Sequence, residues 1–447
     1  YIVAYTYTGL LDFSGPVQTL LRQSFSLEIG TYYFPEIRSI GGAITMLSLV
    51  LYPYVYLIAR DAFSFQSQNL SISTQMLGVN PIRHFIHISL PIARPAIAAG
   101  TALALMETLA DYGTVAFFGI NVFTTGIFRT WFGLGEPILA MQLASLLLIG
   151  VVLVVAYEIH FRKKISFQPT LSTRRKPTKL NGTRAISACV FCALVFACGF
   201  FIPFLQLLYW TIAIADQKLT SDYTTLLFNS LSLATITALI AVSLALICSL
   251  ATRSWRQSRL INVAYFFTKL GYAIPGTIVA IGIIIPFSKI DHVINDWINT
   301  IAGHTPGLLI SGTLFTVIFA HLVRFVPVAI LGMESGISSI ATSIDQVSST
   351  LGVSRWRHLK KIQFPILYPS LITSFTLVFL ESIKELPATL ILRPFNFDTL
   401  AVKGFELATD ERLADAAPAV ITIVIIGLIP IAILSKSISQ KYGMNNE

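Results

Sequence analysis

The sequence predicts an all-α polytopic membrane protein made of two homologous helical bundles in parallel duplication. Hydrophobic residues make up 54% of the chain and charged residues only 12%, whereas an ordinary soluble domain carries about 25% charge. Continuous apolar runs of roughly 20 residues, the length a helix needs to cross a bilayer, recur and exclude a β-barrel, whose strands alternate. The net charge of +9 sits in particular loops, so it does not indicate nucleic-acid binding.

The duplication is visible as a repeat at an offset of 274 residues. The matched pairs are Pro53 with Pro327, Gly78 with Gly352, Pro91 with Pro365, Pro95 with Pro369, and Glu107 with Glu381. Proline matches alone exceed what chance gives at a single offset. Both copies place a polar, basic segment between apolar stretches, so the repeat predicts a transporter that is pushed at two equivalent points.

About ten transmembrane helices are expected in this chain, each an apolar run bounded by polar loops. The first run is a remnant, and Pro275-Gly276 in the seventh run is a weak point for a helix. The expected segments are 1–12, 40–60, 93–111, 137–160, 186–213, 229–252, 262–287, 308–332, 368–392 and 416–437.

The loops predict the orientation of these helices. Loops 161–185 and 253–269 contain several Lys and Arg and no acidic residue, and segment 352–367 is also basic. The alternate loops, 288–307 and 393–415, carry more acidic than basic residues. Because positive loops stay in the cytoplasm, the basic loops and the C-terminus are expected there.

The same loops predict the domain organisation. Segment 161–185 is expected to be a basic cytoplasmic linker between a first half, residues 1–160, and a second half, residues 186–437. Residues 438–447 would form a cytoplasmic tail. Two bundles in the same orientation are parallel repeats, related by an axis along the membrane normal.

The start of the chain suggests a missing portion of the first half. Residues 1–4 read YIVA, similar to TIVA at 277–280, and the second copy has two more apolar stretches upstream. We therefore expect two N-terminal helices to be missing, so that the complete subunit would have about twelve.

The segment that carries function is a duplicated hinge, here called the first hinge (residues 73–96) and the second hinge (residues 347–370). In each, a Gly permits positive φ and a sharp turn, an amphipathic stretch follows, and a Pro is expected to end that stretch where the chain re-enters the membrane. The prediction is a short helix parallel to the membrane and rigidly joined to a transmembrane helix. The motif residues are Gly78, Ile88, Leu90 and Pro91, then Gly352, Ile362, Phe364 and Pro365.

This spacing resembles the EAA loop of ABC importer permeases, through which ATPase subunits drive the membrane subunits. The usual Glu-Ala-Ala is degenerate here, reading Ile72-Ser73-Thr74 and Gln346-Val347-Ser348. Four further stretches resemble the fused, two-domain permeases of the ferric iron uptake group. They are LYPYVYLIARDAF (51–63), ETLADYGTVAFFG (107–119), TTGIFRTWFGLG (124–135) and KELPATLILRPFNFDTLAVKGFELA (384–408).

The resemblance implies a multi-pass permease of the bacterial inner membrane that works with a cytoplasmic ATPase dimer and a periplasmic iron-binding protein. ATP and Mg would bind to the partner ATPase, and this chain would hold no cofactor. The sequence agrees, because it has no GxxxxGK[ST] phosphate-binding loop and no nucleophile–base constellation. The subunit itself is thus expected to be non-catalytic.

Four acidic residues in apolar runs are candidates for the translocation path. Glu107 and Asp111 lie four residues apart, and Glu381 and Glu385 lie four apart at the matching positions. Carboxylates are costly in lipid, so they should face the bundle interior or an aqueous path, where they would attract a cation such as Fe³⁺. The alternative is structural pairing with Lys384 or an arginine.

Other polar groups have simpler interpretations, and no metal site is fixed by the sequence. Cys189 and Cys192 form a CxxC without further ligands, so they are expected to pack between helices. His84, His87 and His358 are expected to be solvated residues of the hinges. Two alternatives stay open: a permease of the same type for thiamine, phosphonate, polyamine or sulfate, and an ion-gradient-driven secondary transporter, which would show inverted repeats.

Overall fold

The computed structural model describes residues 1–28, 31–64, 66, 72–74, 76–163, 180–214, 221–255 and 258–443, which fold into helices without a strand. Nine of these helices are long and apolar enough to cross a membrane. They are Ile40–Ser64, Pro81–Ala110, Pro137–His160, Thr183–Ile214, Tyr223–Ser254, Gly276–Ala302, Leu314–Ser339, Trp356–Ile383 and Leu413–Ala432. The predicted all-α polytopic fold is confirmed.

The chain divides into two compact units, Tyr1–Gln206 and Leu207–Glu447. The division falls within α11 (Ile202–Ile214), so α10 (Thr183–Phe196) packs with the first unit. The π turn that follows α10, Ala197–Phe201, is held in this unit by the Tyr7 hydroxyl, which donates to the Cys198 carbonyl at 2.6 Å. Residues 164–179 of the predicted linker lie outside the described residues, so the linker and the predicted boundaries of the halves stay predictions.

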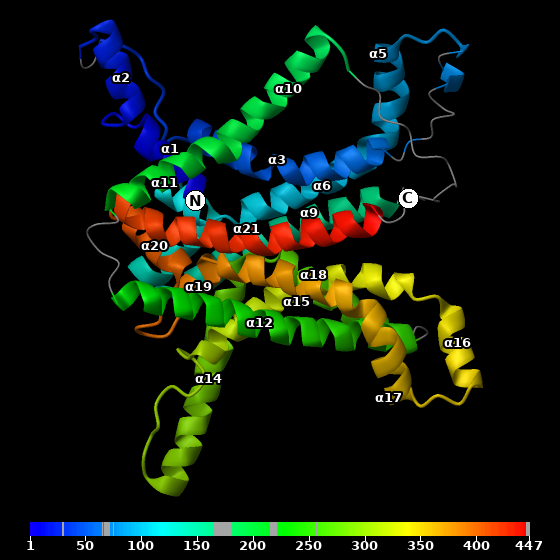
Figure 1. Ribbon diagram of the computed structural model, residues 1–447. Coiled ribbons are helices and arrows are strands. Elements are labelled where there is room, and N and C mark those ends of the chain that lie inside the picture. Colours follow the sequence, from blue (N-terminus) through cyan, green and yellow to red (C-terminus); the bar gives the residue numbers. More distant parts are fainter. Residues whose placement is uncertain are drawn as a thin grey trace. The chain divides into compact units, whose positions relative to one another are not determined.

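In the first unit, helix α6 (Leu90–Ala110) packs between α3 (Ile40–Ser64) and α9 (Pro137–Lys163). Gly100 brings α6 close to α3, because a Cβ there would lie 2.8 Å from the Val55 Cα. Small residues allow such close backbone approach, which supplies packing energy where lipid supplies no hydrophobic drive. The predicted remnant forms α1 (Ile2–Leu11), which is followed by α2 (Pro16–Phe25) (Figure 1).

In the second unit, helices α12 (Ser221–Ser254), α15 (Leu314–Ser339) and α18 (Phe364–Ile383) pack against one another, and α21 (Leu413–Gly443) contacts α18. One face of α12 presents a fully buried stripe of alanines to this core: Ala234, Ala238, Ala241 and Ala245. The spacing of four, three and four residues places them on one side of the helix. The core is therefore assembled from small residues on α12 and large ones, such as Phe325 and Met333, on α15.

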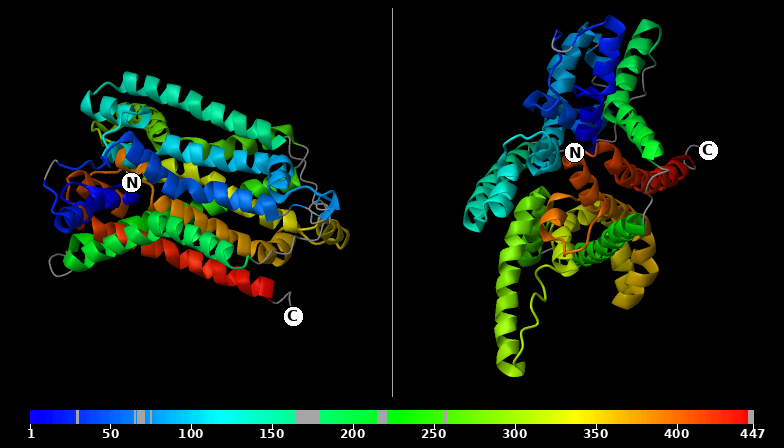
Figure 2. Two further views of the ribbon diagram at one scale, coloured as in Figure 1. Left: turned by 90° about the horizontal axis from the view of Figure 1, so that it is seen from above. Right: turned by 90° about the vertical axis from the view of Figure 1, so that its left-hand side faces the viewer.

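The predicted segment 262–287 is wrong as a single helix. Helix α13 (Arg259–Leu270) and a 3₁₀ turn, Gly271–Ala273, are followed by extended Ile274, and α14 (Gly276–Ala302) begins after Pro275. The break falls at the weak point that the sequence marks, because a residue before proline avoids the α region. Residues 288–302, predicted as loop, are helical, and α14 runs away from the bundle of its unit (Figures 1 and 2).

Candidate functional site

Both hinges turn at their glycine as predicted. Gly78 has φ +71° and Gly352 has φ +66°, and, apart from the adjoining residues, no atom of the described residues lies within 4 Å of a Cβ built on either. The left-handed conformation, rather than lack of space, therefore requires glycine. An equivalent hydrogen bond closes each turn at matched positions. The Val79 N–H donates to the Thr74 carbonyl at 3.1 Å, and the Val353 N–H donates to the Ser348 carbonyl at 3.0 Å. A bond of this type ends a helix at a left-handed glycine.

After each glycine the chain forms a short α-helix and then a π-helical turn. The first hinge contains α5 (Pro81–His84) and the π turn η1 (Phe85–Ser89), which leads into α6. The second contains α17 (Arg355–His358) and η5 (Leu359–Gln363), which leads into α18. At the offset of 274 the two π turns occupy the same positions, so the joint belongs to the repeat.

The expectation that Pro91 and Pro365 end the short helices is wrong. Both prolines lie in the first turn of the following membrane helix, and the Leu90 and Phe364 N–H groups bond to carbonyls five residues back. A proline ring clashes with the carbonyl four residues before it in a regular helix. The extra residue of a π turn displaces that carbonyl, so the helix runs through the proline instead of stopping.

The predicted motif residues thus lie along one continuous path. Ile88 is in η1, Leu90 and Pro91 begin α6, Ile362 is in η5, and Phe364 and Pro365 begin α18. Figure 1 shows that α5 stands across the direction of α6, and that α17 stands across the direction of α18. Each hinge is therefore a crosswise lever that continues without a break into a membrane helix.

A histidine in each hinge reaches back across the glycine turn. His84 Nδ1 shares a hydrogen bond of 2.8 Å with Thr74 Oγ1, and His358 Nε2 lies 3.0 Å from Asp345 Oδ1. The two histidines occupy matched positions. Reading them as solvated was therefore incomplete, because each ties its short helix to the chain before the glycine. His87 is exposed, and its Nδ1 lies 3.2 Å from the Arg83 carbonyl.

The second hinge is also attached to α12 by Arg253. Its Nε and Nη2 donate to Asp345 Oδ2 at 2.9 and 2.6 Å, and its Nη1 and Nη2 donate to the carbonyls of Ile337 and Ile340 at 3.0 Å each. Asp345 lies in α16 (Thr342–Thr350), directly before the glycine turn. Partial burial works to raise the pKa of Asp345, but the hydrogen bonds from Arg253 and His358 outweigh it and hold that pKa below its usual range. Sequence reasoning missed this pair, although Asp345 is the one acid beside the degenerate Gln346-Val347-Ser348.

The four candidate path acids lie at or just beyond the ends of α6 and α18 that are farther from the hinges. Asp111 precedes the first residues of α7 (Gly113–Phe117) and accepts from the N–H groups of Thr114 and Val115 at 3.1 and 3.2 Å. Glu385 stands in the same way before α19 (Pro387–Leu392) and accepts from the Ala388 N–H at 3.0 Å. Thr114 and Ala388 are matched positions, so both copies use an acid to begin a buried short helix.

The second copy surrounds its acid with a buried polar cluster. Glu385 pairs with Arg324 of α15, and the two side chains are 6% and 8% exposed. Beside them His321, fully buried, has its Nδ1 2.8 Å from Ser382 Oγ and its Nε2 3.0 Å from Thr389 Oγ1. This cluster joins α15, α18 and α19, and a Cβ at Gly276 would lie 2.5 Å from Glu385 Oε1, so the start of α14 meets it too.

The two remaining path candidates differ from each other. Glu381 pairs with Lys384 at 2.9 Å, with a side chain 20% exposed. Glu107 is half-buried. The sequence leaves open the alternative that the acids pair with Lys384 or an arginine. The second copy shows both pairings, Glu381 with Lys384 and Glu385 with Arg324. A role of the four acids in a path stays a prediction.

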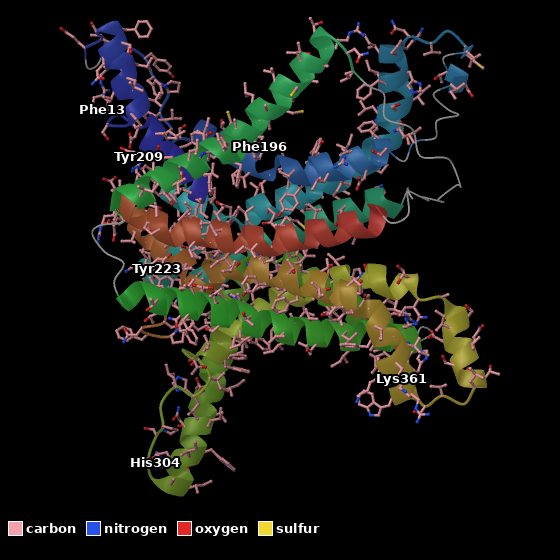
Figure 3. The ribbon with its side chains drawn as sticks, viewed as in Figure 1. Phe13, Phe196, Tyr209, Tyr223, His304 and Lys361 are labelled. Carbon is pink, nitrogen blue, oxygen red and sulfur yellow. The ribbon has the colours of Figure 1, made fainter. Side chains whose placement is uncertain are left out.

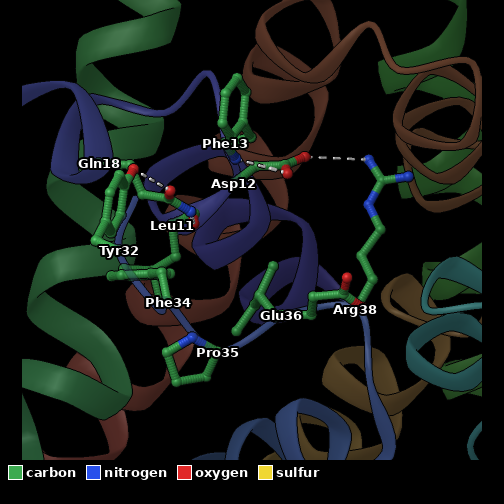
Figure 4. Close-up of a pocket in the computed structure, with 10 residues that line it drawn as sticks. Leu11, Asp12, Phe13, Gln18, Tyr32, Phe34, Pro35, Glu36 and Arg38 are labelled. Atoms are coloured by element: carbon green, nitrogen blue, oxygen red, sulfur yellow. Dashed lines mark hydrogen bonds and ion pairs between the residues drawn. The ribbon is translucent and has the colours of Figure 1, made fainter. Parts of the chain in front are cut away.

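A cavity of about 440 Å³ lies in the first unit, where α1 and α2 meet the approach to α3. Asp12 and Arg38 form an ion pair of 3.7 Å on its wall, and Gln18 Nε2 donates to the Leu11 carbonyl at 2.9 Å (Figure 4). Among the described residues, no group of three or more His, Cys, Asp and Glu is placed to hold a metal ion. The cavity is lined by Leu11, Asp12, Phe13, Gln18, Tyr32, Phe34, Pro35, Glu36, Ile37 and Arg38.

Duplicated membrane bundles, each with a crosswise lever continuous with a membrane helix, define the chain as a membrane transport permease. It belongs to the family of binding-protein-dependent transport system inner membrane components, whose model matches residues 35–166 and 241–440. Each matched stretch contains one hinge. The family match and the relatives described next confirm the resemblance to ABC permeases of the ferric iron uptake group.

Three relatives illustrate the similarity. The Fe(3+)-transport system permease protein FbpB 2 of Haemophilus influenzae is 25% identical over 404 residues, which cover 88% of this chain and 76% of the relative. The ferric transport system permease protein FbpB of Actinobacillus pleuropneumoniae is 22% identical over 419 residues, or 88% of this chain and 57% of the relative. PhnV of Salmonella typhi, named as a putative permease of a 2-aminoethylphosphonate transport system, is 28% identical over 205 residues. These cover 45% of this chain and 71% of the relative.

Proposed function

We propose that this multi-pass inner membrane protein is the permease subunit of an ATP-driven importer that moves iron(III) into the cytoplasm from a periplasmic binding protein. The family description supports dependence on a binding protein. The two ferric permeases, each aligned over 88% of this chain, support iron as the substrate. The acidic residues at the ends of α6 and α18 suit a hard cation, which prefers oxygen ligands.

The observation that carries the proposal is the continuity of each hinge with its membrane helix. A flexible loop would absorb a push, whereas α5 and α17 pass through hydrogen-bonded π turns into α6 and α18. ATP binding closes a dimer of separate ATPase subunits, whose surface grooves move both hinges. The attached helices then rock and open the path toward the loaded binding protein, and hydrolysis resets the state.

The orientation follows from the same proposal. Both hinges and the C-terminus face the cytoplasm, where ATP and Mg bind to the partner ATPase. The permease performs no covalent chemistry. Glu107, Asp111, Glu381 and Glu385, at the opposite ends of the hinge-linked helices, then lie toward the periplasm. Glu107 and Glu381 line the entry of the path, and Glu385, paired with Arg324, supports it from the bundle interior. The end-to-end separation of hinge and acid within α6 and within α18 supports this placement.

A second candidate is a permease of the same type for a phosphonate, favoured by the 28% identity to PhnV, although that alignment covers only 45% of this chain. Thiamine, polyamine and sulfate remain alternatives of the same kind. A secondary transporter driven by an ion gradient is the other alternative, and it would form no complex with an ATPase.

Uptake measured in a deletion strain tests the proposal. We expect uptake of radioactive iron to fall to background, return with the wild-type gene, and stay at background when the ATPase carries an inactivated ATP site. Phosphonate uptake should be unchanged. Loss of phosphonate uptake with normal iron uptake would contradict the assignment of iron as the substrate, but not the assignment of the chain as an importer permease. Iron uptake that persists with the inactivated ATPase and requires a proton or sodium gradient would contradict the ATP-driven mechanism.

A further inference from the structure

The two hinges have the same backbone but different outer surfaces. In the first hinge Ile82 is 69% exposed, and Phe85 and Ile86 are each 48% exposed. Arg83 and His87 are exposed beside them, and Arg83 is matched by Arg357, so both hinges carry an arginine at this position. In the second hinge the residues matched to Ile86 and His87 are Lys360 and Lys361, and both are exposed. The repeat therefore keeps the lever and changes the chemistry of its surface.

The basic groups of the second hinge are available to a partner. Arg357, Lys360 and Lys361 form no ion pair within the described part of the chain, and no acidic residue occurs between Asp345 and Glu381. Asp345 is already engaged by Arg253. Lys360 Nζ lies 5.3 Å from the ring centre of exposed Trp356, which orients the ammonium group. Figure 3 locates Lys361 on the crosswise segment of the second hinge.

We propose that the two hinges hold their ATPase subunits by different forces, the first by apolar contact and the second by charge. The inference rests on the proposed function. Its partner is an ATPase groove with an apolar floor, which receives Ile82 or Trp356, and an acidic rim, which receives Lys360 and Lys361. If the two ATPase subunits are identical, the rim is used on one side of the complex only.

An anionic lipid surface is the other occupant that a tryptophan and two lysines would suit. The geometry favours the ATPase. The second hinge is fixed by Asp345 to α12 and stands across α18, so its basic face is held in one direction by the protein itself. The first hinge has the same crosswise geometry, with Ile86 and His87 in place of the two lysines.

Salt distinguishes charged from apolar contacts, because the Debye length falls from about 10 Å at about 0.1 M salt to about 3 Å at about 1 M, and only charged contacts are screened.

Leu77 and Leu351 are matched and are 79% and 73% exposed, so Leu77→Cys and Leu351→Cys place a cross-linker at equivalent points. The background carries serine at Cys189, Cys192, Cys198 and Cys248. The permease is purified with its ATPase, and cross-linking to the ATPase is measured across this range of salt.

We expect the yield from position 351 to fall at least about fivefold at high salt, and the yield from position 77 to stay constant, because only charged contacts are screened. Lys360→Gln with Lys361→Gln should lower the yield from 351 at low salt, whereas Lys360→Arg with Lys361→Arg should preserve it. The apolar change Ile82→Ser should lower the yield from 77 at every salt concentration.

The other outcomes are distinct. Equal salt dependence at both positions, or none at either, overturns the inference and leaves the proposed function intact. No cross-link from either position contradicts the proposed function itself. Without ATPase, labelling of Leu351→Cys is compared in vesicles of phosphatidylcholine alone and with phosphatidylglycerol. Protection that requires phosphatidylglycerol would assign the basic face to lipid and overturn the inference.

Discussion

Arg253 Nη2 donates to Asp345 Oδ2 at 2.6 Å and so joins the last turn of α12 to the helix that leads into the second hinge. The same guanidinium also holds two carbonyls, those of Ile337 and Ile340, at the end of α15. The second lever is thus attached to two membrane helices besides the one it continues into. In the proposed mechanism, these contacts would pass a force on the second hinge to the bundle.

Removing this attachment should loosen α16 and reduce coupling. Asp345 is partly exposed, so Asp345→Ala is expected to cost only about 1 kcal/mol locally, which corresponds to roughly fivefold faster hydrogen exchange. We expect the increase in residues 342–363, together with reduced iron uptake. The control is Ser349→Ala, which removes only a bond to the Gln346 carbonyl of the same helix. Unchanged exchange in Asp345→Ala would show that the attachment does not hold α16.

The glycine turns should be intolerant of alanine in both hinges. Gly78→Ala and Gly352→Ala place a Cβ on a left-handed residue, which costs about 1–2 kcal/mol, whereas asparagine adopts this conformation more readily. Uptake should therefore fall in the alanine variants and less in Gly78→Asn and Gly352→Asn. Gly150→Ala is the control, because Gly150 lies within α9 with ordinary φ and, outside its own stretch of helix, no atom in the described part of the chain would lie within 4 Å of a Cβ there. Equal activity of all five variants would refute the need for positive φ.

The buried pair of Arg324 and Glu385 should be sensitive to loss of one partner. Arg324→Met leaves a buried carboxylate uncompensated, at a cost of about 3–5 kcal/mol, whereas replacing both residues by methionine should cost less. Thermal unfolding of the protein in detergent measures both variants. The exposed pair of Arg412 and Asp415 is the control, and Arg412→Met should cost about 0–1 kcal/mol. A double variant less stable than the single one would contradict this account.

The path acids have a separate test. Glu107→Gln combined with Glu381→Gln removes two negative charges at matched positions while keeping hydrogen-bonding capacity. We expect iron uptake to be lost and the ATPase to co-purify as before, because the hinges are untouched. Glu136→Gln, at an exposed residue outside these helices, should transport normally. Normal uptake in the double variant would remove Glu107 and Glu381 from the path.

Features fixed by local backbone chemistry were predictable from the sequence. Gly78 and Gly352 mark their turns because only glycine adopts positive φ without strain, and Pro275 marks the break before α14 because proline restricts its predecessor. The π turns were missed, since a shift of hydrogen-bond register by one residue has no residue type of its own. Pro91 and Pro365 therefore suggested an end where the structure has a joint.

Contacts between distant residues were not predictable. Arg324 and Glu385 lie 61 residues apart, and the positions matched to them in the first copy are Val50 and Asp111, so the repeat gives no hint of the pair. Arg253 was assigned to a basic loop for orientation, and only the fold brings it to Asp345. Sequence patterning thus identified the levers but not what holds them.

The sidedness of the two levers tests the central claim most directly. A membrane-impermeant maleimide is applied to Leu77→Cys and Leu351→Cys, each in the cysteine-free background, in spheroplasts and in inverted vesicles. The account predicts labelling of both positions in inverted vesicles only. Labelling of either position from the outside of spheroplasts would place the hinges on opposite faces, or both in the periplasm, and would contradict an importer driven through two equivalent cytoplasmic levers.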